Sequence, residues 1–162
     1  MFLRAAELVR VWPLSSVTHR FATLEDVPLL AELNHQLIQD QRHRNPMNVR
    51  ELAQRMTGWL ASGEYSAILF EDEKKEVVAY ALYREQQQPA EIYLRQFFVT
   101  RHRRRQSLGR KAFLRLRELW PKNRRITVEV LAGNKPALEF FRSVGYVDYS
   151  VALEIMPAAV PH

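Results

Sequence analysis

Residues 92–120 read IYLRQFFVTRHRRRQSLGRKAFLRLRELW, and this stretch decides the fold of the chain. Ile92 to Val99 is an apolar, aromatic-rich run that is typical of a strand. From Leu108 to Trp120 the apolar side chains recur at helical spacing, and Pro121 ends the helix. A basic loop with one glycine joins the two elements. Because the first N–H groups of a helix lack partners and lie at the positive end of its dipole, the helix start predicts a phosphate site.

The loop over residues 104–112 adds positive charge to those N–H groups. Ser107 and Gly109 are small, so the backbone there can approach a pyrophosphate closely. Between Arg95 and Arg125 the chain has twelve Lys or Arg and one acidic residue, whereas the remainder carries a net charge of −5. A basic stripe on an otherwise acidic protein indicates a localised anionic ligand, and the alternative is a solvated charged face. The basic side chains of the loop are Arg104, Arg105, Arg110 and Lys111.

The bulk composition indicates one globular domain. The chain has 162 residues, of which 47% are hydrophobic and 26% charged, enough for one sizeable core. We expect an appendage over residues 1–17 and a single domain over residues 18–162. The absence of cysteine excludes disulfides, thiolate metal sites and a cysteine nucleophile. No apolar run approaches the roughly 18 residues that cross a bilayer, so we expect a cytoplasmic protein with no membrane partner.

The other segments predict a mixed α/β fold. Thr23 and Asp26 form a capping box before one helix, and a second helix runs from Asn48 to Gly63, which suits a left-handed cap. The charged turn 71–76 joins two strands into a hairpin, whereas the later order strand, helix, strand implies a parallel crossover. The strands are expected at 19–22, 65–70, 77–83, 92–99, 126–131 and 147–155, and the last helix at 135–143.

Two motifs follow one another along the second half of the chain. Val99 is followed by Arg104-x-x-Ser107-x-Gly109, and the strand end Glu129-Val130 is followed by Asn134-x-x-Ala137. In this order and with this spacing they resemble the GNAT superfamily of N-acetyltransferases, whose phosphate loop reads Q/R-x-x-G-x-G/A. The resemblance covers about residues 18–156, and it extends to the family's aromatic residues and G-F pair, here Phe140-Phe141 and Gly145-Tyr146.

The resemblance implies a GNAT-like fold, a mixed and mostly antiparallel sheet flanked by helices, in which a bulged central strand splays from its neighbour around the pantetheine arm of acetyl-CoA. Backbone groups near Phe98 to Thr100 would hold that arm, and amides from Gln106 to Lys111 would hold the pyrophosphate. Asn134 would contact the cofactor, although helix capping alone also accounts for its position. The residues expected to bind acetyl-CoA are Phe98, Val99, Thr100, Arg104, Gln106, Ser107, Leu108, Gly109, Arg110, Lys111, Asn134 and Phe141.

The resemblance also implies direct transfer of an acetyl group to the primary amine of a small molecule or protein. An alkyl amine with a pKa near ~10 is mostly protonated at neutral pH, so a base helps. Glu129 matches the base position of the branch that acetylates protein N-termini; the alternative is a surface glutamate. We expect Glu129 and Tyr93 to be catalytic, with Glu91 as a further candidate. His35 and His43 lack metal-ligand spacing, so we expect no metal ion.

Two residues depart from the family pattern. Ser107 replaces the first loop glycine, so either the backbone there is not left-handed or the serine is strained. Phe141 replaces a tyrosine proposed as general acid, and a phenyl ring cannot donate a proton. Two alternatives therefore stay open: a relative that binds acyl-CoA without catalysis, and a basic module that binds nucleic acid. The second is disfavoured because no reading helix or aromatic RNA platform accompanies the basic run. A homodimer is compatible with such a domain.

Overall fold

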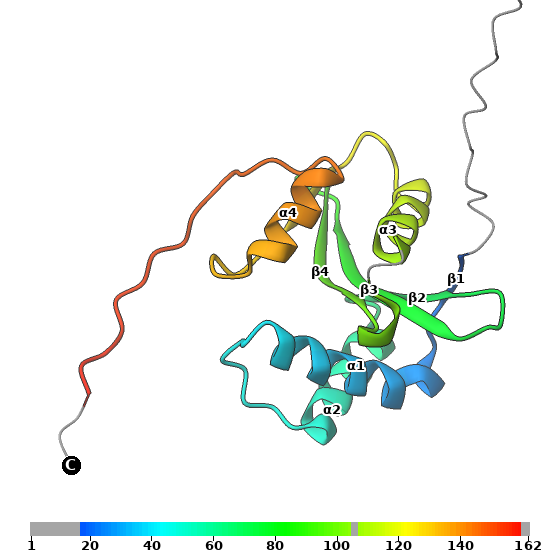
Figure 1. Ribbon diagram of the computed structural model, residues 1–162, viewed down its shortest axis with the longest axis horizontal. Helices are drawn as coiled ribbons and strands as arrows, with labels where there is room; N and C mark the ends of the chain where they lie inside the picture. The colour runs from blue at the N-terminus through cyan, green and yellow to red at the C-terminus, as the bar shows by residue number, and fades with distance from the viewer. Residues whose placement is uncertain (1–16, 105–106, 160–162) are drawn as a thin grey trace, which may run out of the picture.

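The computed structural model describes residues 17–104 and 107–159. Within them, five strands form one sheet that four α-helices flank (Figure 1). Of the predicted appendage, residues 1–16 lie outside the described residues, and Val17 is fully buried. The elements are β1 (Thr18–Phe21), η2 (Leu24–Asp26), α1 (Val27–Asp40), α2 (Val49–Ser62), β2 (Ser66–Glu71), β3 (Val77–Gln86), β4 (Glu91–Val99), η3 (Arg101–Arg103), α3 (Leu108–Leu119), β5 (Arg125–Val128) and α4 (Lys135–Ser143), where η marks a short 3-10 helix.

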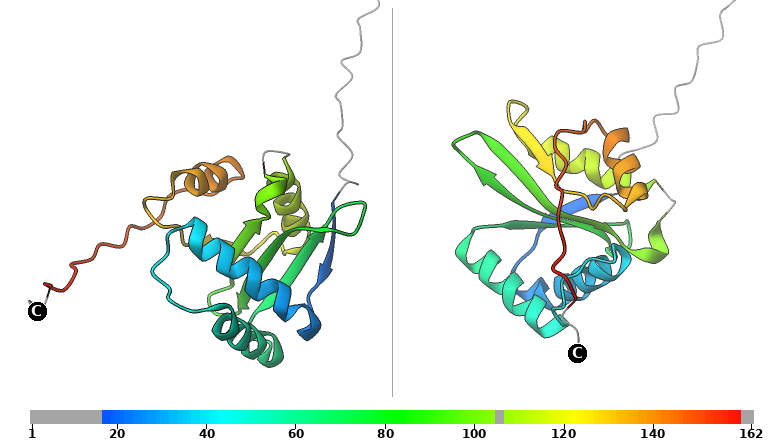
Figure 2. Two further views of the ribbon diagram at one scale, coloured as in Figure 1. Left: turned by 60° about the horizontal axis from the view of Figure 1, so that its bottom comes forward. Right: turned by 90° about the vertical axis from the view of Figure 1, so that its left-hand side faces the viewer.

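The sheet is mixed and mostly antiparallel, which confirms the predicted fold class. Its strands lie in the order β1-β2-β3-β4-β5, and only the β4–β5 pair is parallel among the described strands. Helices α1 and α2 cover one face, and α3 and α4 cover the other (Figure 2). The core therefore has two layers, and β4 contributes to both, with Phe98 packed in the α1–α2 layer and Leu94 in the α3–α4 layer.

Local signals set the helix ends where the sequence placed them. Asn48 Oδ1 accepts a hydrogen bond from the Glu51 N–H at 2.9 Å, and the Glu51 carboxylate accepts one from the Asn48 N–H at 2.8 Å. This reciprocal box satisfies two N–H groups at the start of α2. Gly63 ends α2 in the left-handed conformation, with φ of 73°. Before α1, the Asp26 carboxylate accepts from the Thr23 N–H at 2.8 Å.

Strands β4 and β5 separate after a short pairing, which confirms the expected splay. The pairing covers Glu91–Leu94 and Arg125–Val128, after which β4 continues without β5 to Val99. On its other edge β4 stays paired with β3, except that Arg95 is an extra residue with no partner in the register. An extra residue of this kind is a β-bulge and bends its strand. The bulge and the end of the β4–β5 pairing coincide, so a wedge opens there.

The predicted closing strand at 147–155 was wrong. Residues 147–159 are extended but pair with no described strand, and they run away from the body of the domain (Figures 1 and 2). The alternating pattern marks a segment with one apolar face, but it does not say which sheet edge receives that face. Strand β5 is also shorter than the predicted 126–131, because the chain leaves the sheet after Val128. The side chains on the apolar face of the segment are 81% to 99% exposed: Val147, Tyr149, Val151, Leu153 and Ile155.

Candidate functional site

The wedge between β4 and β5 opens into a cleft of about 520 Å³. Its walls come from β4 beyond the bulge, the residues after β5, the end of α1, the start of α3 and one side of α4. This volume lies within the roughly 300–1,000 Å³ that small-molecule sites occupy. The fold thus gathers most of the predicted site residues in one place. Those that line the cleft are Phe98, Val99, Arg104, Ser107, Leu108, Gly109, Arg110, Glu129, Asn134 and Phe141.

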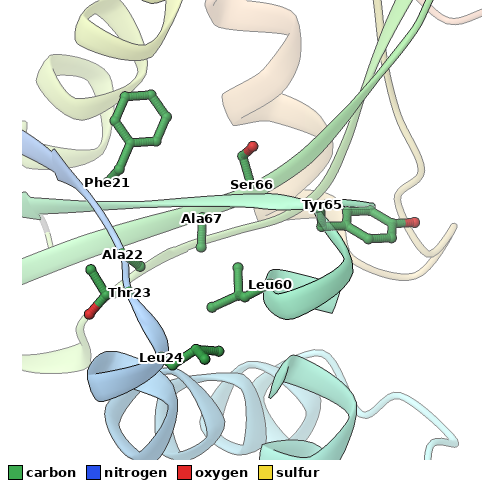
Figure 3. A pocket seen from close by; sticks show the side chains of 9 residues that line it. Phe21, Ala22, Thr23, Leu24, Leu60, Tyr65, Ser66 and Ala67 are labelled. Carbon is green, nitrogen blue, oxygen red and sulfur yellow. The ribbon is translucent and has the colours of Figure 1, made fainter. Parts of the chain in front are cut away.

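A second, smaller hollow of about 300 Å³ lies between the end of β1, the end of α2 and the start of β2 (Figure 3). Its described lining includes apolar residues such as Leu24 and Leu60, together with Thr23, Tyr65 and Ser66. None of these described lining residues is a carboxylate, histidine, lysine or arginine. The larger cleft, which brings charged and polar groups together, is therefore the candidate site.

Helix α3 begins at the cleft. Ser107, just before it, has φ of 58° and is therefore left-handed. A non-glycine residue in this conformation is strained by about 1–2 kcal/mol, which decides between the two alternatives that the sequence left for Ser107. The Lys111 N–H donates to the Ser107 carbonyl at 3.1 Å. The amides of residues 108–110 come earlier in the helix and have no helical partner, so they suit an anion. Arg105 and Gln106 lie outside the described residues.

Gly109 holds α3 close to β4. A Cβ atom built on Gly109 would lie 3.1 Å from Val99 Cγ2 and 3.5 Å from Phe140 Cε2. The first distance is shorter than an ordinary van der Waals contact of 3.4–4 Å. A side chain here would therefore push the helix start away from the strand. The glycine thus fixes the distance between the amides of α3 and the wedge.

Arg104, predicted to neutralise phosphate, is engaged within the chain. Its Nη2 donates to Asp40 Oδ2 at 2.6 Å, and its Nε donates to the Val99 carbonyl at 3.1 Å. Arg101 Nε donates to the other oxygen of Asp40 at 3.0 Å. Burial raises the pKa of Asp40, but the hydrogen bonds from both arginines outweigh it, so this pKa lies below its ordinary value. Asp40 therefore joins the end of α1 to the end of β4, and a phosphate would compete with it for Arg104.

The two expected catalytic residues lie on either side of the point where β4 and β5 part. Glu129 follows the last β5 pair and lines the cleft. Tyr93 lies one residue before the end of the paired part of β4 and is outside the cleft lining. It is nevertheless close enough to Glu129 for the carboxylate to shift its pKa. Burial raises the pKa of Tyr93, the Glu129 carboxylate raises it further, and the Arg95 guanidinium opposes both. The Tyr93 hydroxyl is therefore protonated at neutral pH and can donate a hydrogen bond.

Glu91, the further candidate for the base, has a structural role. Arg125 Nη1 donates to Glu91 Oε2 at 2.5 Å, and Thr127 Oγ1 donates to Glu91 Oε1 at 3.0 Å. This carboxylate therefore links β4 to β5 at the paired end, away from the wedge. Thr100 is also engaged, because its N–H donates to the Val78 carbonyl at 2.9 Å and continues the β3–β4 ladder. That amide is not available to the pantetheine arm.

Helix α4 forms the aromatic wall of the cleft. Asn134 Oδ1 accepts from the Ala137 N–H at 3.3 Å, so its side chain caps α4 while it lines the cleft. The Phe140 ring stacks on Phe97 at 5.7 Å, and the mostly buried Phe141 packs edge-on against Phe140 at 5.3 Å. Phe141 thus belongs to an apolar cluster, and it brings no proton donor to the cleft.

Several residues of the cleft are not among the site residues predicted from the sequence. From the end of α1 come Leu37, Asp40 and Gln41, which no local pattern links to β4. From β4 come Arg95 and Gln96, whose signal was present: two adjacent polar residues interrupt an otherwise apolar strand. Gln96 is buried, and its Oε1 accepts a hydrogen bond from the Tyr80 hydroxyl at 3.0 Å.

Neither a metal cluster nor a membrane span is present in the described part of the chain. No group of three or more His, Asp or Glu in residues 17–104 and 107–159 is placed to hold a metal ion. None of the helices in the same ranges is both long and apolar enough to span a membrane.

Comparisons with known proteins agree with this geometry. The model of the acetyltransferase (GNAT) family matches residues 30–146. No curated protein matches the chain. A mutant of the BH1408 protein of Bacillus halodurans is similar in fold, with 20% identity, a TM-score of 0.74 and coverage of 86% of this chain and 99% of that one. A predicted acetyltransferase of Clostridium acetobutylicum with acetyl-CoA has 16% identity and a TM-score of 0.65, with coverage of 86% of this chain and 96% of that one. An aminoglycoside acetyltransferase from an uncultured soil sample, in complex with sisomicin, has 13% identity, a TM-score of 0.67 and coverage of 89% and 97%.

Proposed function

The chain belongs to the acetyltransferase (GNAT) family, and from this premise we propose that it transfers the acetyl group of acetyl-CoA to a primary amine of a small molecule or protein. The observation that carries the proposal is the cleft itself. It begins where β4 parts from β5 and ends at the N-terminus of α3. One site thus combines unpaired strand groups, unpaired helix amides and a carboxylate.

The described residues fit acetyl-CoA. Beyond the bulge, the groups of β4 that face the wedge have no strand to pair with in the described structure, so they can hydrogen-bond to the amide-bearing pantetheine arm. The amides of residues 108–110 suit the pyrophosphate, and Gly109 keeps them close to the strand. Arg110 stands at the same end of the cleft and adds positive charge, whereas Arg104 would reach a phosphate only in competition with Asp40. The bound cofactor would supply an acetyl thioester.

Proton transfer would take place at the end of the wedge where β4 and β5 part. Glu129 would accept a proton from the amine, since it lies in the cleft just after β5. A positioned base of this kind contributes about 10²- to 10⁴-fold in rate. Tyr93 keeps its proton at neutral pH and would donate a hydrogen bond near the departing thiolate, a role that Phe141 cannot take. The thiolate resembles that of cysteine, with a pKa of about 8.5, so a weak donor suffices.

The basic loop does not favour the nucleic-acid alternative. Arg101 and Arg104 both bind Asp40, and Arg103 Nη1 lies 2.6 Å from Asp72 Oδ2. These arginines are therefore held against the domain by carboxylates rather than aligned for a phosphate backbone. Of the twelve basic residues of the stripe, five form ion pairs within the described residues: Arg101, Arg103, Arg104, Arg115 and Arg125.

Titration calorimetry with acetyl-CoA tests the cofactor, and mass spectrometry of an amine panel incubated with acetyl-CoA tests the reaction. We expect one acetyl-CoA per chain and a gain of one acetyl group on an accepted amine. Binding without acetylation of any amine would favour the silent relative. No binding at physiological salt would refute the proposal, and salt-dependent binding of DNA or RNA would then favour the nucleic-acid module.

A further inference from the structure

The bulge residue Arg95 belongs to a group of arginines on the α1–α2 side of the cleft. Arg95 lines the cleft, and its guanidinium lies 4.7 Å from the centre of the Trp59 ring. The guanidinium of Arg55 lies 4.5 Å from the centre of the same ring. A third guanidinium, that of Arg84, lies 5.4 Å from the Tyr93 ring. Arg95 and Arg84 thus place positive charge near Tyr93, the residue whose pKa the Glu129 carboxylate raises, and Arg55 adds charge at the Trp59 ring.

Carboxylates do not balance these charges in the described structure. Neither Arg55 nor Arg95 forms an ion pair within the described residues, and Arg84 reaches Glu64 only at 3.9 Å. Arg55 Nη2 donates to Asn34 Oδ1 at 3.1 Å, while its Nε is buried without a partner. Burial lowers the pKa of Arg55, and the positive charge of Arg95 lowers it further. By contrast, Arg101 and Arg104 at the other end of the cleft are paired with an acid.

We infer that the amine acceptor also carries a carboxylate or phosphate group, which Arg95 binds directly while Arg55 adds charge behind the Trp59 ring. The inference rests on the proposed function, because it places the amine at Glu129 in the same cleft. A guanidinium suits either anion, since its planar N–H groups match two oxygens at once. An acceptor with only positive charge would meet like charge at this wall.

Matched acceptors test the inference. Amino acids are compared with their carboxamides, and phosphoethanolamine with ethanolamine, in the wild-type protein, in Arg95→Gln and in the control Arg50→Gln, an exposed arginine of α2. We expect kcat/KM to be at least tenfold higher for one acid-bearing series, and Arg95→Gln to remove that preference with an unchanged KM for acetyl-CoA. A preference for the neutral amines, or an equal loss for both members of a pair, would overturn the inference while leaving acetyl transfer intact.

A second measurement does not depend on turnover. With the cofactor site saturated by CoA, inorganic phosphate should raise the Tm of the wild-type protein and of Arg50→Gln more than that of Arg95→Gln. Equal shifts in all three proteins would overturn the inference.

Discussion

Replacing Gly109 with alanine should weaken acetyl-CoA binding about tenfold without unfolding the protein. The new Cβ would lie 3.1 Å from Val99 Cγ2, so the helix or the strand must move by a few tenths of an ångström. Overpacking typically destabilises by about 1–3 kcal/mol, and the better helix propensity of alanine returns about 1 kcal/mol. A net loss of about 0–2 kcal/mol leaves a folded domain. A tenfold weaker Kd corresponds to a loss of about 1.4 kcal/mol in binding free energy. Displacement of the amides of residues 108–110 from the pyrophosphate would account for a loss of this size.

Gly58→Ala is the matched control. Gly58 lies inside α2, and nothing lies within 4 Å of a Cβ built there. This change has the same helix propensity gain without the clash, so Tm should rise by about 2–4 °C with an unchanged Kd. Thermal unfolding and titration calorimetry on both variants separate the two effects. The reasoning is refuted if Gly109→Ala raises Tm as much as Gly58→Ala does and binds acetyl-CoA with the wild-type Kd.

Three further variants test other parts of the cleft. Glu129→Gln should cut turnover by at least tenfold, because a base contributes roughly 10²- to 10⁴-fold in rate, and the loss should be smaller at higher pH. The same change should lower the pKa of Tyr93, which the Glu129 carboxylate raises. An unchanged pH–rate profile, or an unchanged ultraviolet titration of tyrosine, would contradict this. Ser107→Gly should relieve about 1–2 kcal/mol of left-handed strain, but the flexibility of glycine in the unfolded chain costs about 0.5–1 kcal/mol. The Tm should therefore stay level or rise slightly, and a clear fall in Tm would argue against the left-handed turn. Asp40→Asn should destabilise the protein at pH 7 by at most about 1 kcal/mol. The folded-state pKa of Asp40 is lowered, so its contribution is present above the unfolded pKa of about 3.9 and is lost as pH falls through the folded pKa. Urea unfolding should therefore show the stabilities of the wild-type protein and the variant converging as the pH falls below the unfolded pKa of about 3.9, and a constant difference would contradict the ion pair.

Local signals in the sequence were enough to place most of the elements. Asn48 and Gly63 mark the ends of α2 because capping and left-handed termination depend on a few neighbouring atoms. The motif from Val99 to Gly109 likewise placed the helix start at the end of the central strand. Such features need no knowledge of the rest of the chain.

Contacts between distant segments were not readable in the same way. Asp40 and Arg104 are 64 residues apart, and nothing near either residue indicates the other. The bulge at Arg95 depends on the register between β3 and β4, which a single strand does not reveal. The closing strand failed for a related reason: its alternation describes one segment, whereas a strand also needs an edge. The assignments of Glu129 and Tyr93 remain predictions, since their roles depend on a substrate.

Glu129 lies just past the last β4–β5 pair, so the ladder that positions Val128 does not extend to the proposed base. A catalytic carboxylate must be held within a narrow geometry, and misplacement by about 1 Å can reduce the rate 100-fold. The position of Glu129 therefore depends on the short β4–β5 pairing that precedes it, whereas the amides of α3 would bind acetyl-CoA independently of that pairing.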